Sequence, residues 1–215
     1  MFVSGVLLGA GASNRFGSPK MLAPVGEKKK RPLLRRVLEE WLGAGFDEVI
    51  VVLGKNAEEI RGKIGDFSYA AAADAAADSR KSVGRKPPVL VENRRWRSGM
   101  FSSVKAGLAA TDPRSTHVAL SPADLPFLSK KSLRAVLSAA ASLDANGSSL
   151  VVPTHAGRRG HPLLIPAALR ARVLSWPDSA RLNQLFDEPD VTVHYLDGFD
   201  ETILRDVDTP DDLSR

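Results

Sequence analysis

Short apolar runs alternate with segments of helical periodicity over most of the chain. Residues 2–8 form a short, mostly apolar run, which predicts the first strand. Residues 32–45 then place leucines four positions apart, which is the spacing of one helix face. The same alternation predicts further strands at 47–54, 88–93, 116–124 and 148–155 and helices at 56–65, 101–110 and 129–143. Strand–helix alternation of this kind indicates an α/β fold with a doubly wound, mostly parallel, Rossmann-like sheet.

The last third of the chain has a different pattern. Gly157 and Gly160 bracket two arginines between extended runs, which predicts a small β-hairpin within residues 155–166. Short helices, a strand at 191–196 and a helix starting near Pro210 complete the expected order of elements. We therefore expect one domain over residues 1–215, with a smaller subregion at 154–199.

Residues 66–88 interrupt this order, because they join a helix to a strand and far exceed the usual length of such a connection. The alanines of this insert favour a helix, but they offer no long aliphatic face to pack. The interpretation favoured by composition is a marginal helix followed by a mobile basic loop. A functional lid is the alternative.

Composition narrows the class of partner. The 215 residues are 43% hydrophobic and 26% charged, with no cysteine and no apolar run near the roughly 20 residues of a membrane helix. The N-terminal apolar run lacks a preceding basic region, so it is expected to be a strand and not a signal peptide, in a cytoplasmic protein. The net charge is +5, but no basic cluster is interleaved with aromatics. These features favour a small anionic ligand and argue against nucleic acid or membrane partners.

The loop after the first strand, LLGAGASNRFGSPKML, is the best candidate for binding that anion. It is not a P-loop, because Gly11 and Gly17 are one residue too far apart and Ser18 and Pro19 separate Gly17 from Lys20. It also fails the dinucleotide fingerprint, since Asn14 stands at the third glycine position. No acidic residue ends the second strand, which weakens an oxidoreductase interpretation further. Ser13 lacks a paired His–Asp pattern, which argues against a serine hydrolase.

The loop instead has the pattern L-x-A-G-x-S-x-R-[apolar]-G-x-x-K, which resembles the first loop of MobA-like nucleotidyltransferases of the GT-A-type fold. Four later segments resemble that family in the same order: NRRWRSGMFSSVKAGL (93–108), SPADLPFL (121–128), GRRGHP (157–162) and DVDTPDDL (206–213). Within the family, Ala10-Gly11 and the paired terminal aspartates resemble the molybdopterin cytidylyltransferase branch more than the guanylyltransferase branch.

This resemblance implies a Mg²⁺-dependent transfer of CMP from CTP to the phosphate of molybdopterin cofactor, with release of pyrophosphate. A molybdenum hydroxylase or its maturation chaperone is the implied downstream partner. Two alternatives stay open at this point. One is guanylyl or sugar-phosphate nucleotidyl transfer on the same fold, and the other is a non-catalytic chaperone that carries the cofactor to a molybdenum hydroxylase.

By the same resemblance, the catalytic residues are Arg15, Lys20 and Asp124. Arg15 suits forked contacts with the β- and γ-phosphates, and Lys20 supplies a compact charge for the α-phosphate and the leaving oxygen. Backbone and side chains of the two loops are expected to bind the nucleotide: Leu8, Gly9, Ala10, Gly11, Ser13, Arg15, Lys20, Asn93, Gly99, Met100, Ser102, Ser103 and Asp124.

Carboxylates are expected to hold the metal. Asp124 follows the fourth strand on the carboxyl edge of the sheet, and Asp206 and Asp208 would supply a second ligand, with no basis for choosing between them. Gly160, His161 and Pro162 are expected on the acceptor side. His161 has two interpretations of similar weight, contact with the acceptor or packing of the hairpin.

Overall fold

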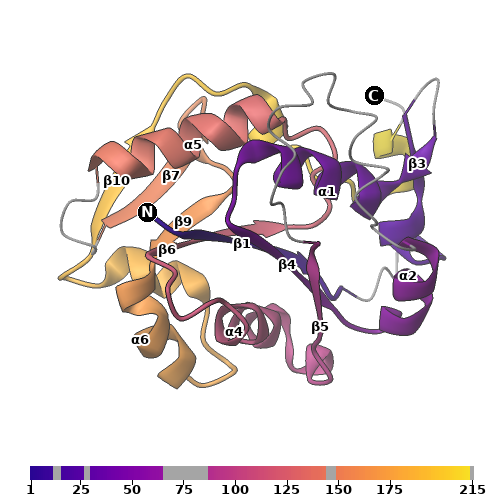
Figure 1. Cartoon of the computed structure of the whole chain (residues 1–215), viewed down its shortest axis with the longest axis horizontal. Coiled ribbons are helices and arrows are strands. Elements are labelled where there is room, and N and C mark those ends of the chain that lie inside the picture. The colour runs from indigo at the N-terminus through magenta and orange to yellow at the C-terminus, as the bar shows by residue number, and fades with distance from the viewer. Residues whose placement is uncertain (12–15, 27–29, 65–86, 144–148, 214–215) are drawn as a thin grey trace.

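A mixed β-sheet with helices on both faces organises the chain (Figure 1). The computed structural model describes residues 1–11, 16–26, 30–64, 87–143 and 149–213. The main sheet is built from β1 (Val3–Gly9), β4 (Glu48–Leu53), β5 (Val89–Glu92), β6 (His117–Pro122), β7 (Ser149–His155), β8 (Arg158–Arg159), β9 (Leu163–Pro166) and β10 (Thr192–Leu196). Its order is β10-β7-β9-β6-β1-β4-β5, with β8 paired to β7. A separate small ribbon pairs β2 (Pro24–Val25) with β3 (Arg31–Pro32).

The helices form one layer on each face of the sheet. α1 (Leu33–Ala44) and α5 (Lys130–Leu143) cover one face, and α4 (Met100–Ala109) and α6 (Arg170–Ser175) cover the other (Figure 1). α2 (Ala57–Ile64) follows β4 near one end of the sheet. Within the described residues, no helix has the length and apolar character needed to cross a membrane.

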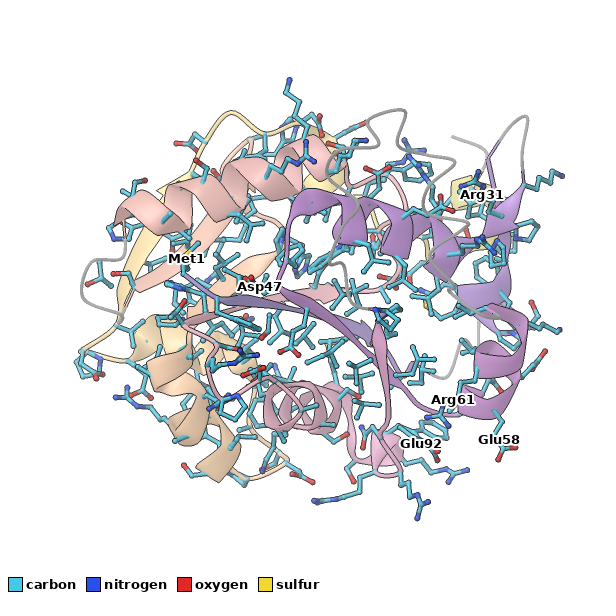
Figure 2. All side chains as sticks on the ribbon, in the orientation of Figure 1. Met1, Arg31, Asp47, Glu58, Arg61 and Glu92 are labelled. Carbon is cyan, nitrogen blue, oxygen red and sulfur yellow. The ribbon has the colours of Figure 1, made fainter. Side chains whose placement is uncertain are left out.

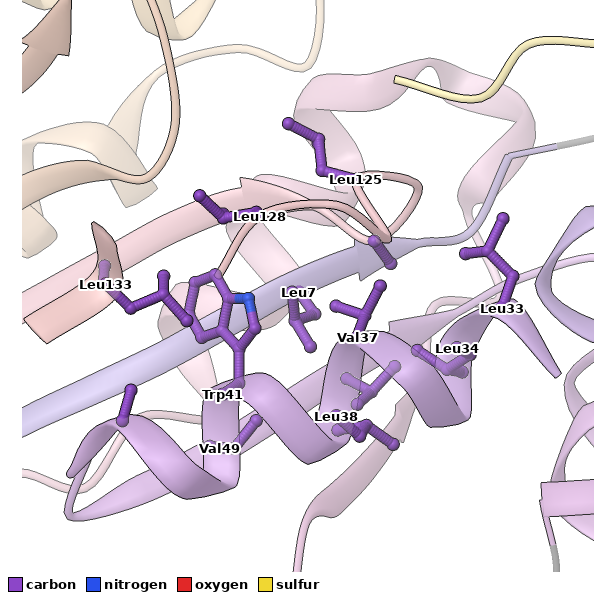
Figure 3. Packing of buried hydrophobic residues seen from close by; sticks show 14 of the residues in the cluster. Leu7, Leu33, Leu34, Val37, Leu38, Trp41, Val49, Leu125, Leu128 and Leu133 are labelled. Atoms are coloured by element: carbon purple, nitrogen blue, oxygen red, sulfur yellow. The ribbon is translucent and has the colours of Figure 1, made fainter. Parts of the chain in front are cut away.

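Side chains alternate between the two cores along the central strands. In β4, Val49 and Val51 join the cluster under α1 and α5, whereas Ile50 and Val52 join the cluster under α4 and α6. This is why the sequence shows uninterrupted apolar runs, since a strand covered on both faces needs no polar position. Trp41 is the largest side chain in the first cluster and packs among the leucines of β1, α1 and α5 (Figure 3). Charged residues such as Glu58, Arg61 and Glu92 lie at the periphery (Figure 2).

The expected α/β fold with a mostly parallel sheet is confirmed. β1 is parallel to β4 and β6, and β4 is parallel to β5. The exceptions are β9, which runs antiparallel between β6 and β7, and the short β8, which is antiparallel to β7. The helix predicted at 32–45 is also confirmed, and it ends at Gly45, whose φ of 109° gives the left-handed cap that glycine favours.

Two predicted elements differ in detail. The hairpin consists of β7 and β8 alone, and the chain after Gly160 leaves it to enter the main sheet as β9. From the sequence alone, one cannot tell which of two consecutive extended runs pairs with its neighbour as a hairpin. The predicted terminal helix is a single 3₁₀ turn, Pro210–Leu213. Most of the insert predicted at 66–88 lies outside the described residues, so its interpretation stays a prediction.

Candidate active site

The site lies where the strand order changes direction, at the carboxyl end of β1. β1 connects through α1 to β4 on one side, and its other neighbour is β6, so the loops after β1 and β6 diverge around a crevice. The Ala123 amide donates to the Leu8 carbonyl over 3.0 Å, which fixes these loops side by side. Gly54 backs the first loop, because a Cβ there would lie 2.4 Å from the Ala10 oxygen.

A cleft of about 660 Å³ opens at this crevice and brings together most of the predicted nucleotide-binding residues. It is lined by Leu8, Gly9, Ala10, Gly11, Lys20, Gly99, Met100, Ser103, Asp124 and Asp208, which come from four separate stretches of the sequence. Two predicted residues, Ser13 and Arg15, lie outside the described residues. Their roles stay predictions.

Lys20 links two carboxylates at the edge of the cleft. Its Nζ lies 2.6 Å from Asp124 Oδ2 and 3.4 Å from Asp208 Oδ1. The side chains of Lys20 and Asp124 are only 13% and 19% exposed, so their charge-assisted hydrogen bond is poorly screened by water. The Val207 amide donates to the Asp124 carbonyl over 2.9 Å and thereby holds the C-terminal segment against the β6 loop.

Within the part of the chain that the structure describes, three aspartates lie near Lys20. Asp124 Oδ1 is buried and has no hydrogen-bond partner among the described residues, although Oδ2 of the same carboxylate contacts Lys20. The pKa of Asp206 is raised above its ordinary value, first by burial and then by the charges of Asp124 and Asp208, with Lys20 partly offsetting both. Among the described residues, Asp124, Asp206 and Asp208 therefore act on one another near Lys20, and Asp208 is the terminal aspartate that contacts this lysine.

The loop between β5 and α4 is held by a buried amide. Asn93 Nδ2 donates to the hydroxyl oxygens of Ser102 and Ser103 over 2.9 and 3.0 Å, and Asn93 Oδ1 accepts from the Arg95 amide over 2.9 Å. Of these side chains, Ser103 lines the cleft, whereas Asn93 and Ser102 are buried beneath it. Gly99 adopts a φ of 104° at the start of α4, a conformation that other residues rarely adopt.

The three residues expected on the acceptor side have different surroundings. Gly160 is buried against Ile203, and a Cβ at Gly160 would lie 2.6 Å from that side chain, so it permits close packing. Pro162 is buried and follows a cis peptide bond. His161 lines a second pocket of about 540 Å³ next to the cleft. Burial lowers the pKa of His161, and the charge of Asp124 and a hydrogen bond to the Leu120 backbone oppose that effect in part.

Several lining residues were not predicted from the sequence. Lys55, Trp96 and Arg97 line the cleft, with the Arg97 guanidinium 4.6 Å from the centre of the Trp96 ring. Lys55 could have been predicted as a cleft residue from the sequence. It follows a buried parallel strand, and the carboxyl ends of parallel strands meet at the same edge of the sheet. The second pocket includes residues 178–183, and no motif marked that segment.

A family model described as the MobA-like NTP transferase domain matches residues 5–193. The chain belongs to this family. It is 33% identical to nicotine blue oxidoreductase of Paenarthrobacter nicotinovorans over 218 residues. The aligned region covers 99% of this chain and 95% of the relative. This family assignment confirms the resemblance found in the sequence motifs.

Solved structures agree with the fold. Rv0371c from Mycobacterium tuberculosis H37Rv superposes with a TM-score of 0.68 at 25% identity, covering 100% of this chain and 97% of that one. Rv0371c has also been solved in complex with manganese. A nucleotidyl transferase from Methanothermobacter superposes with a TM-score of 0.71 at 20% identity, covering 98% of this chain and 94% of that one.

Proposed function

We propose that the chain is a Mg²⁺-dependent cytidylyltransferase that transfers CMP from CTP to the phosphate of molybdopterin cofactor and releases pyrophosphate. The observation that carries this proposal is the cluster of Lys20, Asp124 and Asp208 at the glycine-lined cleft. The family assignment supports nucleotidyl transfer. The choice of CTP and of a molybdopterin acceptor rests on the motifs at residues 93–108, 157–162 and 206–213.

The reaction is an in-line displacement at phosphorus. An oxygen of the acceptor phosphate forms a bond to the α-phosphorus of CTP, while the bond from that phosphorus to the bridging oxygen breaks and pyrophosphate leaves. The protein has to align the two phosphates and neutralise the charge that develops on the leaving oxygen. Lys20 supplies a cation for that role, and Gly9 to Gly11 allow backbone amides to approach the phosphates.

The carboxylates present fit a divalent cation. Asp124 offers a buried oxygen without a described partner, and Asp208 and Asp206 place further negative charge nearby. No group of three potential ligands converges among the described residues, but Mg²⁺ needs only one or two protein carboxylates because phosphates and waters complete its shell. When bound, the cation would neutralise phosphate charge during the displacement. Asp124 and Asp208 are the residues proposed to hold it.

The base and ribose are assigned to the loop that precedes α4. Gly99, Met100 and Ser103 line the cleft, and the hydrogen bonds of Asn93 keep the loop in place before a nucleotide arrives. A preorganised loop reduces the ordering cost of binding. The product would pass to a molybdenum hydroxylase or its maturation chaperone, in a cytoplasmic pathway.

The direct test is pyrophosphate release with CTP, GTP, ATP or UTP, each supplied with molybdopterin cofactor and Mg²⁺. The proposal predicts turnover with CTP well above the other three nucleotides. A preference for GTP would identify a guanylyltransferase instead. Turnover only with a sugar phosphate would remove the molybdopterin assignment, and nucleotide-dependent binding of cofactor without pyrophosphate release would indicate a carrier.

One observation favours a second candidate, reduction of a heterocyclic compound. The relative that is 33% identical over nearly the whole chain is named as an oxidoreductase. The sequence does not supply the usual nicotinamide fingerprint, because Asn14 stands at its third glycine position and Gly54-Lys55 follow β4 in place of an acid. Oxidation of NADH or NADPH in the presence of nicotine blue, with no need for CTP, would establish this candidate.

A further inference from the structure

The second pocket is continuous with the nucleotide cleft. Both are lined by Leu8, Gly99, Met100 and Pro122, so a molecule in one touches the wall of the other. Beyond these shared residues the inner surface is mostly apolar, formed by Phe101, Val104, Leu120, Leu163, Ala180 and Leu182. Its volume of about 540 Å³ falls in the range of roughly 300–1,000 Å³ that small-molecule sites occupy.

One side of this pocket is the segment 178–183, which we call the outer wall. It belongs to the C-terminal third of the chain and approaches α4 only through tertiary contacts. The Trp176 ring, just before the wall, stacks on Phe101 of α4 with centroids 6.2 Å apart. Lys105 Nζ, also on α4, donates to the Trp176 carbonyl over 2.7 Å.

An ion pair then fixes the first residue of the outer wall. Lys105 Nζ lies 3.4 Å from Asp178 Oδ1, and both side chains are about one-fifth exposed. Arg95, from the loop before α4, contacts the other oxygen of Asp178. The same loop and helix carry Gly99 and Ser103 of the nucleotide cleft. α4 therefore sets the position of the outer wall relative to the nucleotide cleft.

The lining indicates the chemistry of the occupant. Apolar side chains make up most of the interior, where Ser121 and His161 add polar groups, and Ser179, Arg181 and Asn183 supply hydrogen-bonding groups on the outer wall. Arg181 forms no ion pair with any described residue, so its charge is available to a ligand. A flat heterocycle with apolar faces and a polar edge suits this arrangement. A sugar ring, which presents hydroxyls in all directions, would leave many of them facing apolar side chains.

We propose that the second pocket holds the ring system of a heterocyclic phosphate acceptor, and that Lys105 and Asp178 are positioning residues for its outer wall. The inference rests on the proposed function in one respect, because the acceptor's phosphate must point toward Lys20 in the adjoining cleft. The ring-binding part is independent of phosphoryl chemistry and can be tested without turnover.

Pterin itself is a suitable probe, since it is a flat, fluorescent heterocycle that carries no phosphate. Titration of the full chain with pterin should give saturable binding that Ala180→Trp abolishes by filling the pocket. CTP binding to this variant should stay within about twofold of the unmodified chain, a difference of under 0.5 kcal/mol. Ala141→Trp is the matched control, because Ala141 is exposed on α5, on the opposite face of the sheet. Equal pterin binding by both tryptophan variants would overturn the inference.

The positioning role predicts a split between kinetic constants. Asp178→Asn and Lys105→Met should each raise the acceptor KM by roughly tenfold, the usual effect of losing one charge-assisted contact, and change kcat and the CTP KM little. Asp178→Glu should restore most of the acceptor KM. Asp190→Asn, which breaks an ion pair with Arg172 away from both pockets, is the control. An equal rise of the acceptor KM in Asp178→Glu and Asp178→Asn would contradict the positioning role. A change in the CTP KM alone would also contradict it.

The two proposals fail in different ways. In one case, no pair of nucleotide and acceptor releases pyrophosphate, but pterin binds to the unmodified chain and not to Ala180→Trp. The proposed function then fails and the pocket assignment stands. If molybdopterin is turned over with an unchanged acceptor KM in Ala180→Trp, the pocket assignment fails and the proposed function stands.

Discussion

The nucleotide cleft and the second pocket adjoin each other but are built by different means. The cleft is lined by the loops that follow β1, β4, β5 and β6 and by Asp208 of the C-terminal segment. Asp124 lies just beyond β6, whereas Lys20 lies at the far end of the loop after β1. The second pocket depends on the outer wall at 178–183, which is held to α4 by Lys105 and by stacking of Trp176. Charged side chains such as Lys20, Asp124 and Asp208 gather at the cleft, whereas the surface of the second pocket is mostly apolar. On the two proposals above, the sheet edge would fix the phosphate chemistry, whereas a tertiary attachment would fix the choice of acceptor.

The largest effect should come from Asp124→Asn, which keeps the shape of the side chain but removes its charge. We expect turnover to fall by roughly 10³-fold, the upper end of the range for losing one transition-state contact, because the carboxylate proposed to hold the cation is lost. Pyrophosphate release measures this, and pterin binding should be unaffected. Unchanged turnover would remove Asp124 from the metal role.

Lys20→Met should lower kcat by roughly 10²-fold, since it removes a cation proposed to act on the developing negative charge. Lys20→Arg should recover only part of this loss, because a planar guanidinium cannot replace a compact ammonium between two carboxylates. The acceptor KM should change little in both variants. A large change in the acceptor KM with a normal kcat would contradict the division of roles between the nucleotide cleft and the second pocket.

Gly99 lines both pockets, so Gly99→Ala should affect both at once. Its φ of 104° is strained for alanine, and the loop must shift to relieve that strain. We expect the KM for CTP and the KM for the acceptor each to rise roughly fivefold, equivalent to about 1 kcal/mol.

Gly198→Ala is the matched control for this prediction. Gly198 has a similar φ of 90°, is exposed, and lines neither pocket. It should lose comparable stability in thermal unfolding but keep both KM values. A rise in only one KM in Gly99→Ala would mean that the shared wall does not couple the two sites.

The smallest predicted effect is on the pH dependence of folding stability, and it involves only His161 on the acceptor side. Because burial lowers the pKa of His161 from its ordinary 6.5, the unfolded chain binds the proton more readily than the folded chain. The contribution of His161 to stability is therefore present above pH 6.5 and is lost as the pH falls through its lowered pKa. His161→Gln should make stability, measured by urea unfolding, fall less steeply between pH 7.5 and pH 5.5 than it does in the unmodified chain. An identical pH dependence in both proteins would contradict this.

Much of the fold and of the nucleotide cleft could be predicted from the sequence, for physical reasons that differ by region. Strands buried on both faces leave continuous apolar runs, so β1 and β4 were apparent, and the glycines and charges of the first loop follow β1 directly. The antiparallel insertion of β9 could not be predicted, because pairing partners are decided by tertiary packing.

The second pocket could not be predicted for a related reason. Asp178 and Lys105 are 73 residues apart, and each has the appearance of an ordinary surface charge in its own segment. Gly160 shows the opposite case. It belongs to a recognisable motif, yet its described surroundings are those of a packing position against Ile203.

The central claim is that two adjoining pockets divide the substrates, with the nucleotide at the charged cleft and the acceptor ring against the outer wall. A crystal structure of the chain with a non-hydrolysable CTP analogue, Mg²⁺ and pterin tests this most directly. The account predicts triphosphate density beside Lys20 and Asp124 and pterin density between α4 and residues 178–183. Density for the nucleotide base in the second pocket, or for pterin in the charged cleft, would contradict it.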